Sequence, residues 1–291
     1  MKKKPTIRFE GYTEDWEQRK LGELANGFDY GINAAATDFD GRNKYIRITD
    51  IDDESHLLKP NNLTSPDFDL SKADDYKLSE GDILFARTGA SVGKTYKYKT
   101  SDGYVYFAGF LIRAKIKQEY DTEFVFQNTL TDKYDRFIRI TSQRSGQPGV
   151  NAQEYQNFDV MIPKLEEQRK IGKYFQDLDN LIILHQSNYE KMVATKKSML
   201  EKLFPQGEAK VPAIRFKGFA GDWEQKPLGA IVIPYSDPVD VPHNGYERLG
   251  IRSHGKGVFH EYVEAGKEIT TAQLHRVAAH NFIVNITFAW E

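Results

Sequence analysis

The sequence predicts a mixed fold of the α/β (α+β) class with mostly antiparallel strands, followed by a long coiled-coil-type helix and by the start of a second, duplicated domain. Three observations predict this order. Short strand signals broken by Gly, Asn and Asp turns fill the first part of the chain. A long helical pattern follows, and the opening of the chain then occurs a second time. The predicted segments are 1–164, 165–204 and 205–291.

The first segment contains three strand-like runs and one helix-like run. Residues 44–51 alternate as a strand does, residues 81–88 form an apolar run after a turn, and residues 104–116 indicate a hairpin or two strands. The spacing of apolar residues over 121–141 predicts a helix. Its predicted core positions are Phe124, Leu130, Tyr134 and Phe137.

The second segment has the pattern of one long helix. From 171 to 203 there is no proline. Mostly apolar residues recur there at alternating steps of four and three, as in the seam of a coiled coil. At about 1.5 Å per residue this run forms a rod of roughly 50 Å. A helix of that length usually packs along another helix, so we expect a partner helix. The seam positions are Ile171, Phe175, Leu178, Ile182, His185, Tyr189, Met192, Lys196, Met199 and Leu203.

The third segment repeats the opening of the first. Residues 5–24 and 212–231 are identical at 11 of 20 positions with a constant offset of 207, and the matches include a tryptophan in each copy. A period of this length indicates a duplicated domain rather than a solenoid. The apolar run 281–291 stands where 81–89 stands in the first copy. We therefore expect the second copy to be incomplete.

The composition excludes several classes of protein. The chain has 291 residues, of which 40% are hydrophobic and 13% aromatic, enough to bury real cores. It shows neither an apolar run long enough to span a membrane nor a signal peptide. The absence of cysteine excludes disulfides and Cys-ligated zinc, and it fits a cytoplasmic location.

The charge is unevenly distributed along the chain. The formal net charge of −2 argues weakly against nucleic-acid binding. However, residues 10–80 carry 8 Lys and Arg against 17 Asp and Glu, whereas residues 81–147 carry 11 against 7. A local basic surface is what phosphate binding requires, although an ordinary uneven surface explains these counts equally well.

Two motifs resemble catalytic motifs but lack features that the catalytic sites require. The run TGASVGKT at 88–95 has Thr88 where a phosphate-binding P-loop has its first glycine, and the residues that follow alternate like a strand. A polar, turn-like stretch contains the letters of a metal-dependent nuclease, which are Pro66, Asp67, Asp75 and Lys77. The seven histidines show no metal-ligand spacing, and a polar seam residue such as His185 more often sets the register of a coiled coil. We therefore expect no metal, no cofactor and no catalysis by this chain.

Two loops are better candidates for binding. Arg87, Thr88, Ser91 and Lys94 would project from one Gly-rich loop, where they suit phosphates and base edges. The loop 141–151 is rich in Ser, Gln, Arg, Asn and Gly. Arg pairs with guanine, and Gln or Asn pairs with adenine. An ordinary cluster of turn residues is the alternative for this second loop.

Three motifs in this order resemble the specificity (S) subunit of type I restriction–modification systems. They are IRFEGYTEDWEQRKLGEL at 7–24, YKLSEGDILFARTGASVGKTY at 76–96, and IPKLEEQRKIGKYFQDLDNLI at 162–182. The last is similar to the family's central region, an IP-x-x-x-EQ-x-x-I block that leads into a long helix. With the internal duplication, the resemblance covers essentially the whole chain.

The resemblance implies two target-recognition domains, each of which reads one half of a split sequence in double-stranded DNA. It also implies methyltransferase (M) subunits docked on the helical spacer and restriction–translocase (R) subunits joined to them. The family itself binds neither S-adenosylmethionine nor ATP. The expected DNA-binding residues are Lys44, Arg47, Arg87, Thr88, Ser91, Lys94, Gln143, Arg144, Ser145 and Gln147. The expected subunit-interface residues are Glu166, Arg169, Lys170, Asp177, Leu178, Ile182 and Tyr189.

The chain departs from the family because it lacks the rest of the second domain and a second long helix. We therefore expect either an inactive protein or one that pairs with another copy through its helix. Two other functions stay open at this point. One is a nucleotide- or Mg²⁺-dependent enzyme acting on nucleic acid, and the other is a coiled-coil adaptor that makes no contact with DNA.

Overall fold

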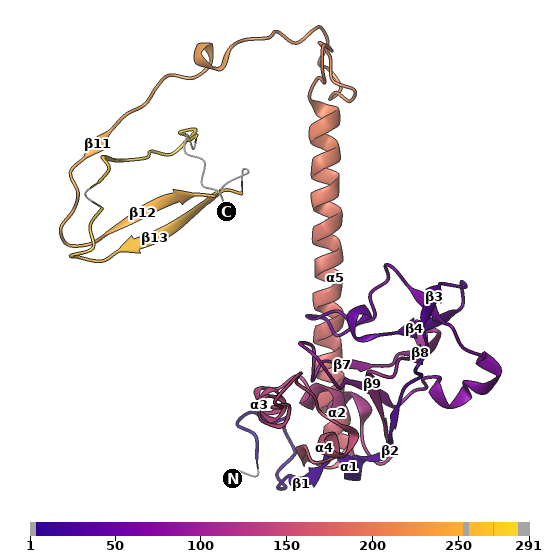
Figure 1. The fold of residues 1–291 in the computed structure, drawn as a ribbon. Helices are drawn as coiled ribbons and strands as arrows, with labels where there is room; N and C mark the ends of the chain where they lie inside the picture. Colours follow the sequence, from indigo (N-terminus) through magenta and orange to yellow (C-terminus); the bar gives the residue numbers. More distant parts are fainter. Residues whose placement is uncertain (1–3, 253–255, 270, 285–291) are drawn as a thin grey trace. The chain divides into compact units, whose positions relative to one another are not determined.

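The computed structural model describes residues 4–252, 256–269 and 271–284. The chain divides into two units, Met1–Thr195 and Lys196–Glu291, and the boundary lies within the long helix α5 (Leu165–Leu203). The first unit comprises a mixed α/β domain and most of α5 (Figure 1).

A four-stranded antiparallel sheet forms the centre of the first unit. In spatial order its strands are β2 (Ala25–Tyr30), β9 (Leu111–Ile116), β6 (Asp82–Ala86) and β7 (Thr95–Lys97). Side chains alternate along a strand, so Ile83 and Phe85 of β6 enter one core while Leu84 and Ala86 enter another. The predicted apolar run at 81–88 is therefore a strand buried on both faces.

Four short helices cover the first face of this sheet. They are α1 (Leu21–Leu24), α2 (Thr122–Asn128), α3 (Asp132–Thr141) and α4 (Ala152–Gln156). Phe124, Tyr134 and Tyr155 of these helices pack in the core with the side chains of β6 and β9. The second face is covered by β4 (Asn43–Ile46) and β8 (Tyr104–Phe107), a parallel pair that contributes Ile46 and Phe107.

The other strands of the first unit form two short antiparallel pairs. They are β1 (Glu17–Lys20) with β10 (Asp159–Ile162), and β3 (Ala36–Asp38) with β5 (Thr64–Pro66). Four 3₁₀ helices complete it, namely η1 (Ile48–Asp50), η2 (Leu70–Lys72), η3 (Asp74–Tyr76) and η4 (Thr100–Asp102). The predicted mixed fold with mostly antiparallel strands and a long helix is confirmed.

One strand prediction needs correction, and the structure decides between the two alternatives for another. The expected strand 44–51 ends at Ile46 because Asp50 accepts hydrogen bonds from both the amide and the side chain of Arg47, at 2.9 Å each, and this closes η1. Of the two alternatives for the run 104–116, the two separate strands are confirmed. β8 pairs with β4, whereas β9 pairs with β2 and β6.

The expected single helix over 121–141 is also wrong, since α2 ends at Asn128 and α3 begins at Asp132. The side chain of Thr131 accepts a hydrogen bond from the amide of Tyr134, as an N-cap does, and so starts a new helix. Because Leu130 falls in the connection, it is 38% exposed rather than in the core.

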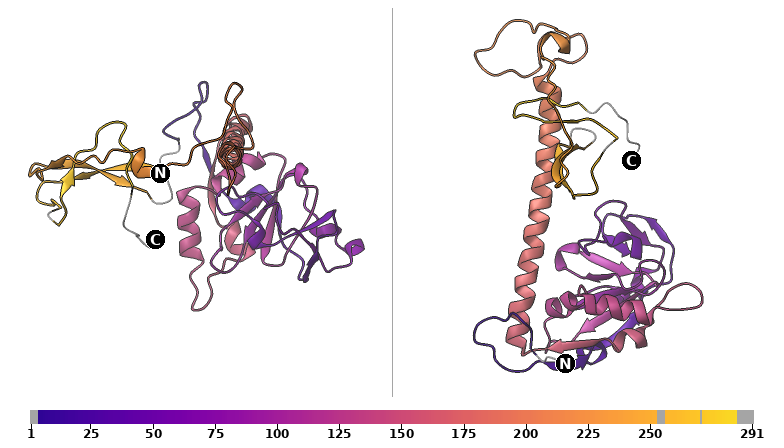
Figure 2. Two further views of the ribbon diagram at one scale, coloured as in Figure 1. Left: turned by 90° about the horizontal axis from the view of Figure 1, so that it is seen from above. Right: turned by 90° about the vertical axis from the view of Figure 1, so that its left-hand side faces the viewer.

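The first turns of α5 are seated deep in the domain. Glu167, Gln168 and Gly172 are buried. Glu167 receives two 2.7 Å hydrogen bonds from Arg8, and the side chain of Gln168 bridges the amide of Asp121 and the carbonyl of Pro163. Past these turns the helix extends beyond the domain, as two perpendicular views show (Figures 1 and 2).

The second unit contains little packed structure among its described residues. Its strands are β11 (Pro238–Val239), β12 (Tyr246–Ile251), β13 (Val258–Val263) and β14 (Leu274–His275), with η5 (Leu228–Ala230) before them. They form the antiparallel pairs β12–β13 and β11–β14. Most apolar side chains in this part are exposed. The apolar run expected at 281–291 lies largely outside the described residues.

Candidate nucleic-acid interface

The two loops singled out from the sequence, 87–94 and 141–151, lie against each other. Thr88 and Gly149 form an antiparallel bridge. On either side of it, the amide of Gly89 donates to the carbonyl of Pro148 at 3.0 Å, and the amide of Val150 donates to that of Arg87 at 2.9 Å. Segments more than 50 residues apart in the chain are thus joined at one place.

Two buried tyrosines anchor the first loop at its ends. The hydroxyl of Tyr155 donates to the carbonyl oxygen of Ala86 at 2.6 Å, and that of Tyr134 donates to the carbonyl oxygen of Gly93 at 3.0 Å. Burial raises the pKa of both tyrosines, so both remain hydrogen-bond donors. Gly93 has φ +90°, and a Cβ there would lie 2.7 Å from Ile138. The loop is therefore built on a rigid base.

The geometry of this loop differs from that of a P-loop. A P-loop turns its backbone amides toward a phosphate, but here the amides of residues 89, 92, 93 and 94 all donate to backbone carbonyls of the protein. The segment that follows is the strand β7 and not a helix. These amides are thus unavailable to wrap a nucleotide.

Arg87 stands at the junction of the two loops. Its guanidinium lies 4.8 Å from the ring centroid of Tyr30 and donates a long, 3.4 Å hydrogen bond to the carbonyl of Gly109. Among the described residues no carboxylate pairs with it. The neighbouring Phe110, whose carbonyl accepts from the amide of Arg87, is 63% exposed. A cation and two exposed aromatic rings therefore share this site, with hydrogen-bonding capacity left on Arg87.

The polar residues of the second loop, Gln143, Arg144, Ser145 and Gln147, are all exposed. Arg144 forms an ion pair with Glu154 and donates to the carbonyl of Thr141 at 2.8 Å. These contacts hold the guanidinium near the loop but leave it at the surface, where a stronger anion can compete with the carboxylate.

The far end of the first loop has a different environment. Lys94 forms an ion pair with Asp53 and donates to the carbonyl of Ile51 at 3.1 Å. Its side chain is only 9% exposed, so it has a structural partner instead of facing solvent. Ser91 is half-buried beside it, and the backbone carbonyl of Ser91 accepts a hydrogen bond from the amide of Lys94.

Lys44 and Arg47 are both tied to neighbouring groups. Lys44 donates to the carbonyl of Asp102 at 2.6 Å, toward the start of the β4–β8 pair. Arg47 is held by two 2.9 Å hydrogen bonds to Asp50, and this pairing raises the pKa of the guanidinium. The structure does not place either beside Arg144.

Sequence reasoning missed two basic residues close to these loops. Arg136 and Arg139 lie on the exposed side of α3, which packs on the first loop through Tyr134 and Ile138 and leads directly into the second. Among the described residues neither is paired with a carboxylate. The sequence pattern of this helix contains the signal for them. Tyr134 and Ile138 mark the buried side of the helix, and Arg136 and Arg139 lie away from that side.

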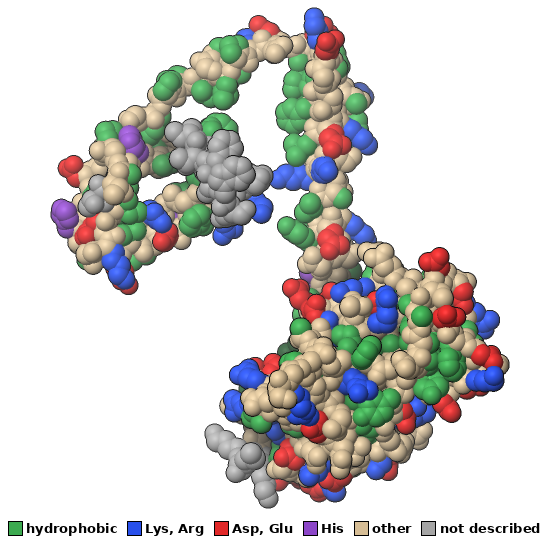
Figure 3. Space-filling view, viewed as in Figure 1, with side chains coloured by type: hydrophobic (Ala, Val, Ile, Leu, Met, Phe, Trp, Pro, Cys, Tyr) green, Lys and Arg blue, Asp and Glu red, His purple; other side chains and the backbone are tan. Residues whose placement is uncertain are grey.

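The expected subunit-interface residues all lie on α5 and are exposed. The four polar ones are Glu166, Arg169, Lys170 and Asp177. Leu178, Ile182 and Tyr189 lie on the predicted seam, with Ile182 66% exposed. Figure 3 shows hydrophobic side chains along α5 where it leaves the domain. Exposed apolar surface along a helix is typical of an interaction surface.

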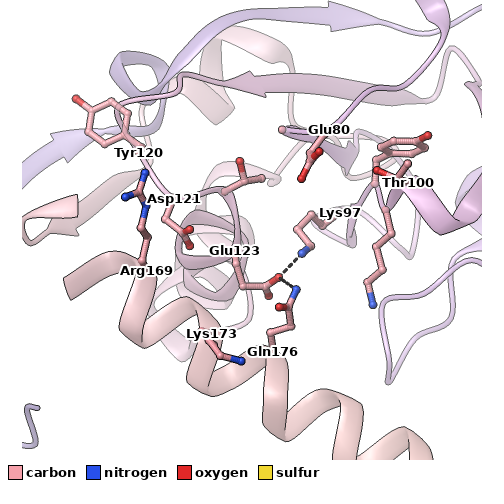
Figure 4. Close-up of a pocket in the computed structure, with 13 residues that line it drawn as sticks. Glu80, Lys97, Thr100, Tyr120, Asp121, Glu123, Arg169, Lys173 and Gln176 are labelled. Carbon is pink, nitrogen blue, oxygen red and sulfur yellow. Dashed lines mark hydrogen bonds and ion pairs between the residues drawn. The ribbon is translucent and has the colours of Figure 1, made fainter. Parts of the chain in front are cut away.

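A polar pocket of about 540 Å³ lies where α5 meets the domain. Lys97 and Gln176 both point at the carboxylate of Glu123, and Lys97 forms an ion pair with it (Figure 4). Arg169 and Lys173 of α5 line the same pocket. The mixed charges link the helix to the sheet and α2, which fixes the direction in which α5 leaves the domain.

The nuclease-like letters do not form a metal centre. Asp67 follows β5 and Asp75 lies in η3, and both side chains are exposed. Within the described ranges, no group of three or more His, Asp or Glu is placed to hold a metal ion. In the same part of the chain, no helix combines the length and the apolar content that a membrane span requires.

Two of the curated proteins that are similar to this chain are type I restriction enzyme specificity subunits. A putative type I restriction enzyme MjaX specificity subunit from Methanocaldococcus jannaschii is 25% identical over 226 residues, which are 74% of this chain and 52% of that protein. The MjaVIII specificity subunit of the same organism is 26% identical over 173 residues, or 58% and 38% of the two chains. The chain thus spans about half the length, or less, of these relatives.

Solved structures give similar matches. The S subunit of a type I restriction–modification system from M. genitalium matches with 18% identity and a TM-score of 0.47, over 66% of this chain and 46% of that one. The HsdS subunit from Thermoanaerobacter tengcongensis matches with 19% identity and a TM-score of 0.45, over 73% and 54%.

The family model for the type I restriction modification DNA specificity domain matches residues 13–192. This range contains the central sheet, both loops and most of α5. More than half of the chain is therefore covered by one family model, and the chain belongs to the family of type I restriction–modification DNA specificity domains.

Proposed function

We propose that the first unit reads one half of a split target in double-stranded DNA, as the sequence-recognition part of a type I restriction–modification complex. The observation that carries the proposal is the junction of the two loops, where the bridge between Thr88 and Gly149 joins the loop that carries Arg87 to the loop that carries Arg144, in a chain of this family. Arginine is the side chain that most often contacts guanine in the major groove. The complex would act on cellular DNA in the cytoplasm.

In this proposal some residues position the protein on DNA and others read its bases. Contacts to phosphate fix the register of a protein on DNA, and contacts to base edges carry sequence information. Arg136 and Arg139 on α3 are suited to phosphates, since they are exposed, unpaired with acids among the described residues, and next to the loops. Arg87, Gln143, Arg144 and Gln147 are suited to bases, because each offers directional donors from a loop that can enter a groove.

We further propose that α5 is the scaffold on which M subunits dock, with R subunits joining through them. The exposed seam favours helix–helix packing, and the exposed charges of Glu166, Arg169, Lys170 and Asp177 lie on other sides of the same helix. In this proposal the chain contributes no catalytic group, and it binds neither S-adenosylmethionine nor ATP. A second reading unit would be needed for the other half of the target.

The alternative functions have less support. A nucleotide-dependent enzyme would need loop amides that point at phosphate, but these amides donate within the protein. A coiled-coil adaptor that never touches DNA accounts for α5 but not for the anchored loops.

The test combines assembly and binding. The chain is mixed with the M subunit of its own system, and binding to a pool of random duplexes is measured over a salt series, followed by sequencing of the bound fraction. We expect salt-dependent binding and enrichment of one short motif. Binding without enrichment would contradict the reading role, and Mg²⁺-dependent cleavage or nucleotide hydrolysis by the chain alone would support an enzyme instead.

A further inference from the structure

A third loop, the turn 108–111 between β8 and β9, lies beside Arg87. A 2.8 Å hydrogen bond from the amide of Leu111 to the carbonyl of Ala108 closes this turn. A Cβ on Gly31, directly after β2, would lie 2.3 Å from the carbonyl oxygen of Ala108, so the two backbones are in close contact. The turn is therefore fixed on the end of the central sheet.

The strand register places Phe110 of this turn opposite Arg87. Ala86 and Leu111 are the last partners of β6 and β9. At the next position, the amide of Arg87 donates to the carbonyl of Phe110 at 3.0 Å. Residues directly opposite each other in an antiparallel pair carry their side chains on the same face, with Cβ atoms about 4.5–5.5 Å apart. Arg87 and Phe110 therefore stand side by side where the sheet ends.

Tyr30 belongs to the same face of the sheet. It is the β2 partner of Ile112, and Ile112 enters the same core as Phe85. Phe85 precedes Arg87 by two residues, and Phe110 precedes Ile112 by two. Because side chains two residues apart on a strand share a face, all three side chains extend this face past the core. The 4.8 Å distance from the guanidinium of Arg87 to the ring centroid of Tyr30 agrees with this placement.

Tyr30 orients the guanidinium of Arg87 and leaves its donors free. The hydroxyl of Tyr30 accepts a 3.2 Å hydrogen bond from the amide of Ala152, so the ring is held between β2 and α4. A guanidinium stacked on a ring keeps its N–H donors, whereas a carboxylate partner would occupy them. Within the described part of the chain, the side chain of Arg87 donates only the 3.4 Å bond to Gly109. Guanine presents its acceptors O6 and N7 to such a group in the major groove.

Phe110 adds an apolar group next to this cation. Its side chain is 63% exposed, whereas that of the adjacent Leu111 is fully buried. The apolar group that base pairs present in the major groove is the C5-methyl of thymine, which phenylalanine can contact. Neighbouring base pairs are about 3.4 Å apart along the duplex, and two side chains that stand opposite each other can reach such neighbours.

We propose that Arg87 and Phe110 read two adjacent base pairs, with the guanidinium on a guanine and the phenyl ring on the methyl group of a thymine. Tyr30 is the positioning residue that orients Arg87. The ligand is a duplex half-site with guanine and thymine at neighbouring positions. This inference deepens the reading function proposed above and rests on it.

The experiment uses the full chain in complex with the M subunit of its own system and a pool of random duplexes. The bound fraction is sequenced, and the selected duplex is then made with thymine or with uracil, which lacks the methyl group, at the position next to the guanine. We expect a motif with adjacent guanine and thymine, and binding about fourfold weaker with uracil, the loss expected for one buried methyl group. This comparison changes only the DNA, so it does not depend on how a variant folds.

Variants of the chain assign the contacts. Phe110→Ala should bind the thymine and uracil duplexes equally, because the methyl group no longer has an apolar partner, and should still select the guanine. Arg87→Ala should lose roughly tenfold to hundredfold in preference for guanine over other bases. Tyr30→Ala should lose part of that preference, and Tyr30→Phe, which keeps the ring, should retain it. Phe68→Ala, at an exposed phenylalanine of the same unit, is the matched control and should change neither preference.

The outcomes separate this inference from the reading function itself. A selected motif without adjacent guanine and thymine, or equal binding of thymine and uracil by the parent chain, would overturn the inference and leave DNA reading in place. A loss with Phe110→Ala that is the same for all duplexes would also overturn it, because stacking on bases tolerates any sequence. If the parent chain selected no motif, both the inference and the proposed function would be wrong.

Discussion

The hydroxyl of Tyr155 donates a 2.6 Å hydrogen bond to the carbonyl oxygen of Ala86, the residue before Arg87. Both groups are buried, and the bond connects α4 under the sheet to the loop that carries the candidate DNA contacts. The interior of the domain therefore controls the position of its binding surface.

Tyr155→Phe should lower the free energy of unfolding by about 1–2 kcal/mol, because a buried hydrogen bond is lost while the ring still fills its site. The cost should stay moderate, since Ala86 keeps a 3.0 Å hydrogen bond from the amide of Gly93. Urea unfolding measures the change. Tyr174→Phe, at an exposed site, is the control and should change stability by less than about 0.5 kcal/mol. Equal effects of the two variants would contradict an anchoring role for Tyr155.

Replacing the loop arginines should separate reading from positioning. Arg87→Ala or Arg144→Ala should weaken duplex binding by about 1–3 kcal/mol if the side chain contacts a base. If the contact is to phosphate, the slope of log K against log salt should fall by about one unit. Arg19→Ala, on β1 and paired with Glu17 and Glu23, is the matched control. If both loop variants bound duplex DNA as tightly as the parent chain across the salt series, these loops would not be part of the interface.

Gly172 should tolerate no side chain. A Cβ at this position would lie 2.4 Å from the carboxylate of Asp121, which caps α2, and 3.1 Å from the amide of Phe124. Gly172→Ala should therefore destabilise the first unit by about 1–3 kcal/mol, as overpacking does, although alanine favours helix. Gly27→Ala, where a Cβ would meet nothing within 4 Å, serves as the control in the same urea measurement. If Gly172→Ala left the free energy of unfolding unchanged, α5 would be able to shift away from α2 at little cost.

A charge on the seam of α5 should block assembly. Ile182→Asp would put an unpaired carboxylate into a helix–helix interface, at a cost of several kcal/mol if the site is dry. Co-purification with the M subunit, and the oligomeric state of the chain alone, report the effect. Ala194→Asp, away from the seam and exposed, should leave both unchanged. A normal complex containing Ile182→Asp would place the partner on another side of the helix.

The length of α5 should set the spacing of a bipartite target. Deleting one heptad, Gln186 to Met192, keeps the seam and shortens the helix by about 10 Å. In a complex that contains two reading units, the gap between half-sites should shrink by up to about three base pairs while both half-sites stay the same. Methylation mapping measures both quantities. An unchanged gap together with altered half-sites would exclude the helix as a spacer.

Much of this fold could be predicted because its signals are local. The apolar run of β6 and the 4,3 spacing of α5 each reflect one periodicity, and each element is present. The errors came from side chains that compete with the backbone. Asp50 ended a strand by binding Arg47, and Thr131 divided one expected helix into two.

The candidate site was only partly predictable, because its residues depend on long-range contacts. The Gly and Ser content of both loops indicated a surface, and the bridge from Thr88 to Gly149 joins them. Nothing local indicated that Lys94 would be held by Asp53, more than 40 residues earlier. The buried roles of Glu167 and Gln168 were likewise hidden, because charged and amide side chains are normally exposed unless a partner such as Arg8 is present.

The close contact at Gly172 attaches α5 rigidly to the domain. Since the helix backbone meets α2 with no room for a side chain, the helix and the domain rotate as one body. A protein that binds the exposed part of α5 therefore orients the loops without contacting them. The rotational entropy lost in orienting the loops would then be given up once, at assembly, and would not recur at every DNA site that the complex inspects.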